Sequence, residues 1–289
     1  MKRIFALALS TLLFTLSCLA PAQAQTYPAY YGQHGTAKFI GGRTVVVSIF
    51  ADDAYTSWDF PLSGAEARLY NTIHERMGIG LRWLEAQVAD YGVHAEFIWD
   101  FDQYDGADGL CRFAQFDEDL TDMNWDTYLT VWHYIHDNID TAGLLSQYGA
   151  DNIVYAIHLN APNYEDGRTS FTFCANKNSV DPNSIYYETS FFLSYGHGRE
   201  NTPALYAHEI LHCFGAPDLY CASDTVPQDY VDYLRESGLK DLMNSCYLSD
   251  YDRVTCVFSN TDAYFVGLLD TCSDERHFDL GPNIFQRWQ

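Results

Sequence analysis

Residues 207–220, AHEILHCFGAPDLY, combine the end of a helix with a sharp reversal of the chain. Upstream, Thr202 can cap this helix, and Pro203 suits its first position. Gly215 can adopt the left-handed conformation that ends a helix, and Pro217 cannot extend one. The sequence therefore predicts a helix that begins at Pro203, ends at Gly215 and is followed by a turn back toward the helix.

The same stretch carries side chains suited to binding a metal. His208 and His212 are one helical turn apart on one face, so both imidazoles can direct a nitrogen at a single Zn²⁺. Glu209 would lie beside the open coordination position and accept a proton from a zinc-bound water as general base. The turn after Gly215 is suited to bringing the Asp218 carboxylate to the ion as third ligand.

These residues resemble the active-site motif of the metzincin clan of zinc peptidases, H-E-x-x-H-x-x-G-x-x followed by His or Asp. Every fixed position of that pattern is matched, by His208, Glu209, His212, Gly215 and Asp218. Clan members with Asp in third place include the snapalysins and the immune inhibitor A type of secreted bacterial peptidase, whose Gly-Leu-Pro-Asp segment is similar to GAPD here. The resemblance implies an endopeptidase that uses one Zn²⁺ to hydrolyse peptide bonds of protein or peptide substrates.

Metzincins also carry a methionine turn beneath the metal, and Met243 in residues 241–245, DLMNS, is similar to it. Some clan members place a tyrosine shortly after this methionine, where it ligates zinc or stabilises the oxyanion. In this chain Tyr247 follows at a longer spacing, and Tyr220 and Tyr251 are alternatives for that role. The resemblance thus implies supporting roles for Met243 and for one of three tyrosines.

Before this motif the sequence predicts alternating strands and helices. Residues 44–50, TVVVSIF, are typical of a strand buried on both faces, and Ser63 and Glu66 form a capping-box pattern that opens a helix ending at Gly92. With a strand at 94–99, these segments make a β-α-β unit whose strands should be parallel. Further elements are expected as a helix at 126–148 and strands at 152–158, 170–174 and 184–194.

The expected fold class is α/β (α+β). The resemblance implies a metzincin-like mixed twisted sheet with helices, an active-site helix and a small C-terminal subdomain. Residues 44–289 are expected to form a single zinc-peptidase catalytic domain, divided into an N-subdomain at about 44–215 and a C-subdomain at about 216–289. A monomer is expected.

The N-terminus predicts export. Lys2-Arg3 precedes an apolar run that ends in Ala22-Gln23-Ala24, the pattern of a signal peptide over residues 1–24. Cleavage near Ala24 would leave a secreted or periplasmic protein with an N-terminal arm at 25–43. No later stretch reaches the roughly 18 apolar residues of a membrane span, and a net charge of −23 argues against nucleic acid and anionic membranes as partners.

Cysteine usage fits an oxidising compartment. Once Cys18 leaves with the signal peptide, seven cysteines remain, enough for up to three disulfides whose pairing stays open. The absence of a C-x-x-C pair argues against a cysteine-ligated metal. Most of these cysteines follow residue 210, which predicts a disulfide-stapled C-subdomain; the seven are Cys111, Cys174, Cys213, Cys221, Cys246, Cys256 and Cys272.

Several alternatives compete with these predictions. The acidic segment 100–122 is expected to be a solvated loop. It could instead hold Ca²⁺, although the spacing of its acidic residues misses the EF-hand pattern; the candidate ligands are Asp100, Asp102, Asp105 and Asp108. His133 and His136 stand at a metal-binding spacing but lack a third ligand nearby in sequence. Glu236 could replace Asp218 as third ligand. Finally, the chain could be an exported non-catalytic zinc-binding or protein-binding module with a peptidase-like fold, with Cys213 as a conceivable fourth ligand.

Overall fold

The computed structural model describes residues 37, 39–58, 61–100, 109–161, 168–172, 188–195, 201–223, 226–269 and 272. Strands and helices alternate before the motif, and helices follow it. In chain order the elements are β1 (Gly42–Asp52), α1 (Gly64–Asp90), β2 (Ala95–Ile98), β3 (Cys111–Gln115), α2 (Trp125–Asn138), α3 (Thr141–Tyr148), β4 (Asn152–Ala161), β5 (Phe171–Thr172), β6 (Thr189–Tyr195), α4 (Pro203–Cys213), α5 (Gln228–Ser237), α6 (Leu242–Ser245), the 3₁₀ helix η2 (Cys246–Leu248) and α7 (Asn260–Phe265).

The strands form one mostly parallel sheet in the order β2-β1-β4-β6-β5, with β3 also paired to β1. β1 runs parallel to β2, β3 and β4, and β4 runs parallel to β6. Only the pairing of β5 with β6 is antiparallel among the described strands. The β-α-β unit predicted from residues 44–99 is therefore confirmed, since Thr44 on β1 pairs with Phe97 on β2 in parallel register.

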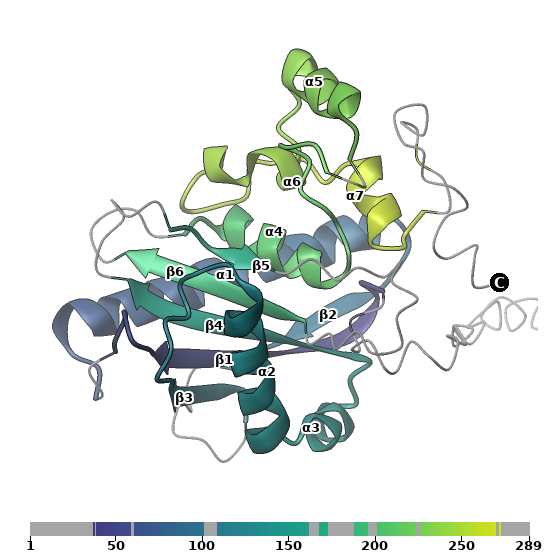
Figure 1. Cartoon of the computed structure of the whole chain (residues 1–289). Coiled ribbons are helices and arrows are strands. Elements are labelled where there is room, and N and C mark those ends of the chain that lie inside the picture. Colours follow the sequence, from purple (N-terminus) through teal and green to yellow (C-terminus); the bar gives the residue numbers. More distant parts are fainter. Residues whose placement is uncertain are drawn as a thin grey trace, which may run out of the picture.

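Helices cover both faces of the sheet (Figure 1). Along β1, Val46 and Phe50 enter one core with α1 and α4, whereas Val47 and Ile49 enter a second core with α2 and α3. This alternation follows from the two-residue period of a strand and explains why residues 44–50 are apolar almost without interruption. Helix α4 packs closely on α1 at Gly80. A Cβ added at Gly80 would lie only 2.4 Å from the Pro203 carbonyl oxygen, so this approach requires glycine.

The single helix expected at 126–148 is wrong, since the structure has two helices there, α2 and α3. Ile139 adopts an extended conformation that ends α2. The Asp140 side chain then accepts a hydrogen bond from Gly143 N at 2.8 Å and caps α3. The Asp140 side chain binds a backbone N–H and so separates the two helices. The spacing of apolar residues continues past Asp140, which is why the sequence predicts a single helix.

The expectation of a continuous loop at 100–122 is also wrong, because β3 lies within it and extends the sheet beside β1. Of the four aspartates considered for Ca²⁺, only Asp100 is described, and the other three lie outside the described residues. Residues 1–36, which hold the expected signal peptide and most of the arm, and Cys174 are outside them as well.

After α4 the chain forms short helices that lie on the α4 side of the molecule (Figure 1). An isolated bridge pairs Asp241 with Val257 and ties the start of α6 to the segment before α7. Within the part of the chain that is described, no helix is long and apolar enough to cross a membrane. Cys111, Cys221, Cys246 and Cys256 carry free thiols in the structure, and the disulfide prediction stays a prediction.

Candidate metal centre

Helix α4 carries the motif and begins as the sequence predicts. The Thr202 hydroxyl accepts a hydrogen bond from Leu205 N at 3.1 Å, with Pro203 in the first turn. At the other end, Gly215 has a φ of 96°, in the region where glycine alone is unstrained. The chain reverses there, so the residues after the helix return toward its last turns.

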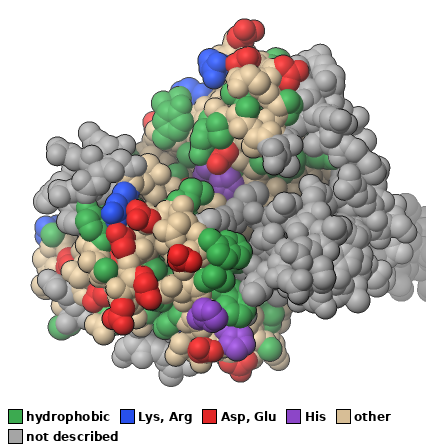
Figure 2. Space-filling view, in the orientation of Figure 1, with side chains coloured by type: hydrophobic (Ala, Val, Ile, Leu, Met, Phe, Trp, Pro, Cys, Tyr) green, Lys and Arg blue, Asp and Glu red, His purple; other side chains and the backbone are tan. Residues whose placement is uncertain are grey.

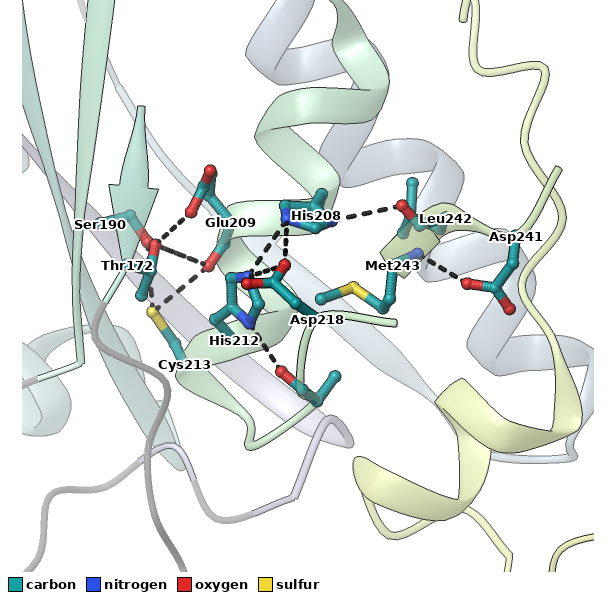
Figure 3. Close-up of polar contacts among 11 residues, drawn as sticks. Thr172, Ser190, His208, Glu209, His212, Cys213, Asp218, Asp241, Leu242 and Met243 are labelled. Carbon is teal, nitrogen blue, oxygen red and sulfur yellow. Dashed lines mark hydrogen bonds and ion pairs between the residues drawn. The ribbon is translucent and has the colours of Figure 1, made fainter. Parts of the chain in front are cut away.

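The reversal brings three side chains to one point (Figure 3). Nε2 of His208 lies 3.1 Å from Nε2 of His212. Oδ1 of Asp218 lies 3.2 Å from the first of these nitrogens and 3.3 Å from the second. His208, His212 and Asp218 thus form a cluster of potential metal ligands, each offering one atom, in the described part of the chain.

Backbone carbonyls fix both imidazole rings. His208 Nδ1 lies 3.2 Å from the Leu242 carbonyl oxygen, and His212 Nδ1 lies 2.7 Å from the Ala216 carbonyl oxygen. A carbonyl oxygen can only accept, so each Nδ1 must carry the hydrogen and donate it. In the neutral rings Nε2 is then an unprotonated acceptor. Two nitrogen lone pairs and a carboxylate oxygen therefore converge, an arrangement that is repulsive unless a positive charge lies among them.

The spacing of the three atoms fits a divalent cation. Ligands about 2.0–2.1 Å from a tetrahedral Zn²⁺ lie roughly 3.3 Å from one another, which matches the three separations between the nitrogens and the carboxylate oxygen. Imidazole and carboxylate are also donors that zinc accepts. The residues present are therefore compatible with the ion that the sequence predicts.

Protons would compete with a metal ion for the atoms of this cluster. Burial lowers the pKa of His208, but Cys246 and Asp218 outweigh burial and raise it well above its usual value. Burial likewise raises the pKa of Asp218, yet hydrogen bonds from His208 and His212 hold it well below its usual range. Both pKa shifts show that the cluster favours a positive charge among these three side chains. Either a metal cation or bound protons can supply that charge.

The segment expected as a methionine turn lies against this cluster. Met243 is fully buried, and its carbonyl oxygen accepts a hydrogen bond from Leu219 N at 3.0 Å, next to Asp218. The neighbouring Leu242 supplies the carbonyl that holds His208. Residues 241–245 therefore support both the helix and the returning turn, through backbone atoms that no side-chain pattern reveals.

Two buried carboxyls stabilise the base of this segment. Asp241 accepts a hydrogen bond from Met243 N at 2.8 Å, and burial raises its pKa to about 6. Asp262 caps α7 with Ser259, and burial together with Asp241 raises the pKa of Asp262 well above its usual value. Burial and the proximity of the two carboxyls therefore both oppose their ionisation.

Glu209 lies on the side of α4 that faces the sheet. Its Oε2 lies 2.7 Å from Oγ1 of Thr172, which comes from β5. Ser190 on β6 donates to the Glu209 carbonyl oxygen at 3.1 Å and also contacts Cys213 Sγ at 3.3 Å. Cys213 consequently points toward the sheet and away from the metal ligands, which removes it as a fourth ligand (Figure 3). Sequence analysis missed Thr172 and Ser190.

The three tyrosines considered for the site differ in position. The Tyr220 ring stacks against His208, with centroids 6.4 Å apart. Burial and the Asp218 carboxylate raise the pKa of Tyr220, so its hydroxyl keeps its proton and can donate. Tyr247 is 68% exposed, and Tyr251 lies under the Arg76 guanidinium at 4.7 Å. This geometry favours Tyr220 over Tyr247 for a role beside the metal, which stays a prediction.

Other candidate ligands lie elsewhere. Glu236 is exposed on α5, outside the cluster that contains Asp218. His133 and His136 both contact Trp132 on α2, and the ring of His136 stacks on it.

Figure 2 shows histidine side chains reaching the surface at the centre of the face, between the sheet-containing body and the C-terminal helices, and a separate group of histidines lower on the same face.

No family model, no curated protein and no solved structure matches the chain.

Proposed function

We propose that the chain is an exported zinc-dependent endopeptidase, with His208, His212 and Asp218 as metal ligands and Glu209 as general base. The convergence of two imidazole Nε2 atoms and one carboxylate oxygen within 3.3 Å supports this most directly. The match to the metzincin motif and the pattern of residues 1–24 support the reaction class and the export.

The chain supplies three ligands to the proposed ion in its described part, which leaves a coordination position for water or substrate. Structural zinc sites close with a fourth protein ligand, and Cys213 is turned away from that position. An open coordination position on a helix that carries Glu209 directly after the ligand His208 therefore favours catalysis over the alternative of a non-catalytic binding module.

When bound, zinc would acidify a water molecule and polarise the scissile carbonyl. Glu209 would take a proton from that water and pass it to the leaving amine. Asp218 and the two imidazoles would hold the ion, and the contacts of their Nδ1 atoms with the carbonyls of Leu242 and Ala216 would leave the imidazole Nε2 atoms available as ligands. The protonated Tyr220 hydroxyl would donate to the oxyanion as negative charge develops.

The test is metal analysis of the purified mature protein combined with casein and peptide-library cleavage. We expect one zinc per chain and cleavage that a chelator abolishes and added zinc restores. A protein that binds one zinc tightly but cleaves no substrate would favour the binding-module alternative. Absence of bound zinc together with chelator-insensitive cleavage would refute the proposal.

A further inference from the structure

Two hydroxyls from neighbouring strands meet the residue proposed as general base. Thr172 on β5 and Ser190 on β6 are paired in antiparallel register, so their side chains lie on the same face of the sheet. Both contact Glu209, Thr172 through the carboxylate oxygen Oε2 at 2.7 Å and Ser190 through the backbone carbonyl at 3.1 Å. All three residues are buried.

Counting hydrogens separates the roles of the two hydroxyls. Thr172 Oγ1 is within reach of two acceptors, Glu209 Oε2 at 2.7 Å and the Glu209 carbonyl oxygen at 3.2 Å, but it has only one hydrogen. The carbonyl already accepts from Ser190. The carboxylate is charged and closer, and hydrogen bonds to charged acceptors are the shorter and stronger ones. The Thr172 hydrogen therefore goes to the carboxylate.

We propose that Thr172 is the positioning residue for Glu209, anchoring Oε2 and leaving Oε1 to receive the proton of the attacking water. This inference rests on the proposed peptidase function. A glutamate has several rotatable bonds, and anchoring one oxygen restricts them before substrate arrives. Without the hydroxyl, Oε2 would be a buried charged atom that has lost its donor, and the side chain would turn to find another.

The test compares Thr172→Val, which keeps the shape but removes the donor, with Thr172→Ser, which keeps the donor. Thr189→Val on β6 is the control, because Thr189 is buried and its Oγ1 accepts or donates no hydrogen bond among the described residues. We expect Thr172→Val to keep one zinc and an unchanged KM while kcat falls at least about 10-fold. Thr172→Ser should recover kcat to within about 3-fold, and Thr189→Val should match wild type.

A readout independent of activity is the crystal structure of metal-free Thr172→Val, in which the Glu209 carboxylate should leave its wild-type position. A Glu209 side chain that stays in place, or a kcat unchanged in Thr172→Val, would overturn the positioning role. If Thr172→Val does not fold, Thr172→Ala replaces it in both measurements with the same expectations. A wild-type protein that cleaves nothing would instead overturn the peptidase function, even if Glu209 moved in the variant.

Discussion

Nε2 of His208 and Nε2 of His212 lie 3.1 Å apart. Each ring donates its Nδ1 hydrogen to a backbone carbonyl, so in the neutral rings the two Nε2 atoms face each other without a hydrogen between them. Two facing lone pairs at that distance repel, and the Asp218 oxygen beside them adds negative charge. The fold therefore holds these atoms in an arrangement that only a positive charge makes favourable.

Removing the third ligand should release the metal. Asp218→Ala deletes a donor atom, and we expect zinc affinity to fall more than about 100-fold, since even outer-shell partners of a ligand contribute 10–100-fold. Glu236→Ala is the matched control, because Glu236 is exposed on α5. Zinc titration with a competing chelator measures both variants. Loss of zinc from Glu236→Ala with retention in Asp218→Ala would transfer the ligand role to Glu236.

Neutralising the proposed base should separate metal binding from chemistry. Glu209→Gln keeps the size of the side chain and an oxygen for the Thr172 hydroxyl, but it cannot accept a proton. We expect full zinc occupancy with kcat reduced about 10²- to 10⁴-fold, the usual contribution of a general base. Peptide hydrolysis and metal content are measured on the same preparation. Wild-type kcat in this variant would require a different base.

The reversal at Gly215 should tolerate no side chain without strain. At a φ of 96°, Gly215→Ala should cost about 1–2 kcal/mol of unfolding free energy and weaken zinc binding by displacing Asp218. Gly238→Asn is the control, because Gly238 has a φ of 66° with open space around it, and asparagine accepts the left-handed conformation. Urea unfolding and zinc titration of both variants check this. Equal stability losses at the two positions would contradict it.

Stability should decrease as the pH rises through the titration of Asp241. Burial raises its pKa to about 6, so the carboxyl is neutral in the folded protein at a pH where the unfolded chain is already ionised. Its stabilising effect is complete below about pH 4 and is lost as the pH rises through about 6, a change on the order of 3 kcal/mol. Asp262 and His208 interact with this carboxyl and will shape the curve.

Asp241→Asn should remove this part of the pH dependence, because an amide stays neutral and its oxygen can still accept from Met243 N. Asp252→Asn, at an exposed position, should leave the wild-type dependence intact. The measurement is urea unfolding of the zinc-saturated proteins at pH 5 and pH 8. An unaltered difference between the two pH values in Asp241→Asn would show that Asp241 is not the responsible group.

Much of the first half of the fold could be predicted because its signals are local or periodic. The apolar run of residues 44–50, the helix after it and the strand near 97 indicate a parallel β-α-β unit, which the structure confirms. The predicted capping box is wrong, since Ser63 makes no side-chain hydrogen bond at the start of α1. Prediction failed at Asp140, where a local cap interrupts an apolar spacing that continues across it. It failed at β3 because a short strand amid acidic residues has little pattern of its own.

The sequence by itself determined the capped helix at Thr202, the reversal at Gly215 and the placement of His208 and His212 one helical turn apart, with Glu209 next to His208 in the chain. These follow from backbone preferences and helical spacing within a few residues of one another. These preferences depend only on neighbouring residues and not on long-range packing, so they can be predicted without a structure.

Only the tertiary structure decided which distant groups complete the site. Thr172 reaches Glu209 through the pairing of β5 with β6, and Leu242 reaches His208 through the packing of α6 on α4. Each contact depends on strand register and on how helices pack, and a one-residue slip would turn the same side chain to the other face. Residues separated by dozens of positions therefore meet for reasons that no local pattern encodes.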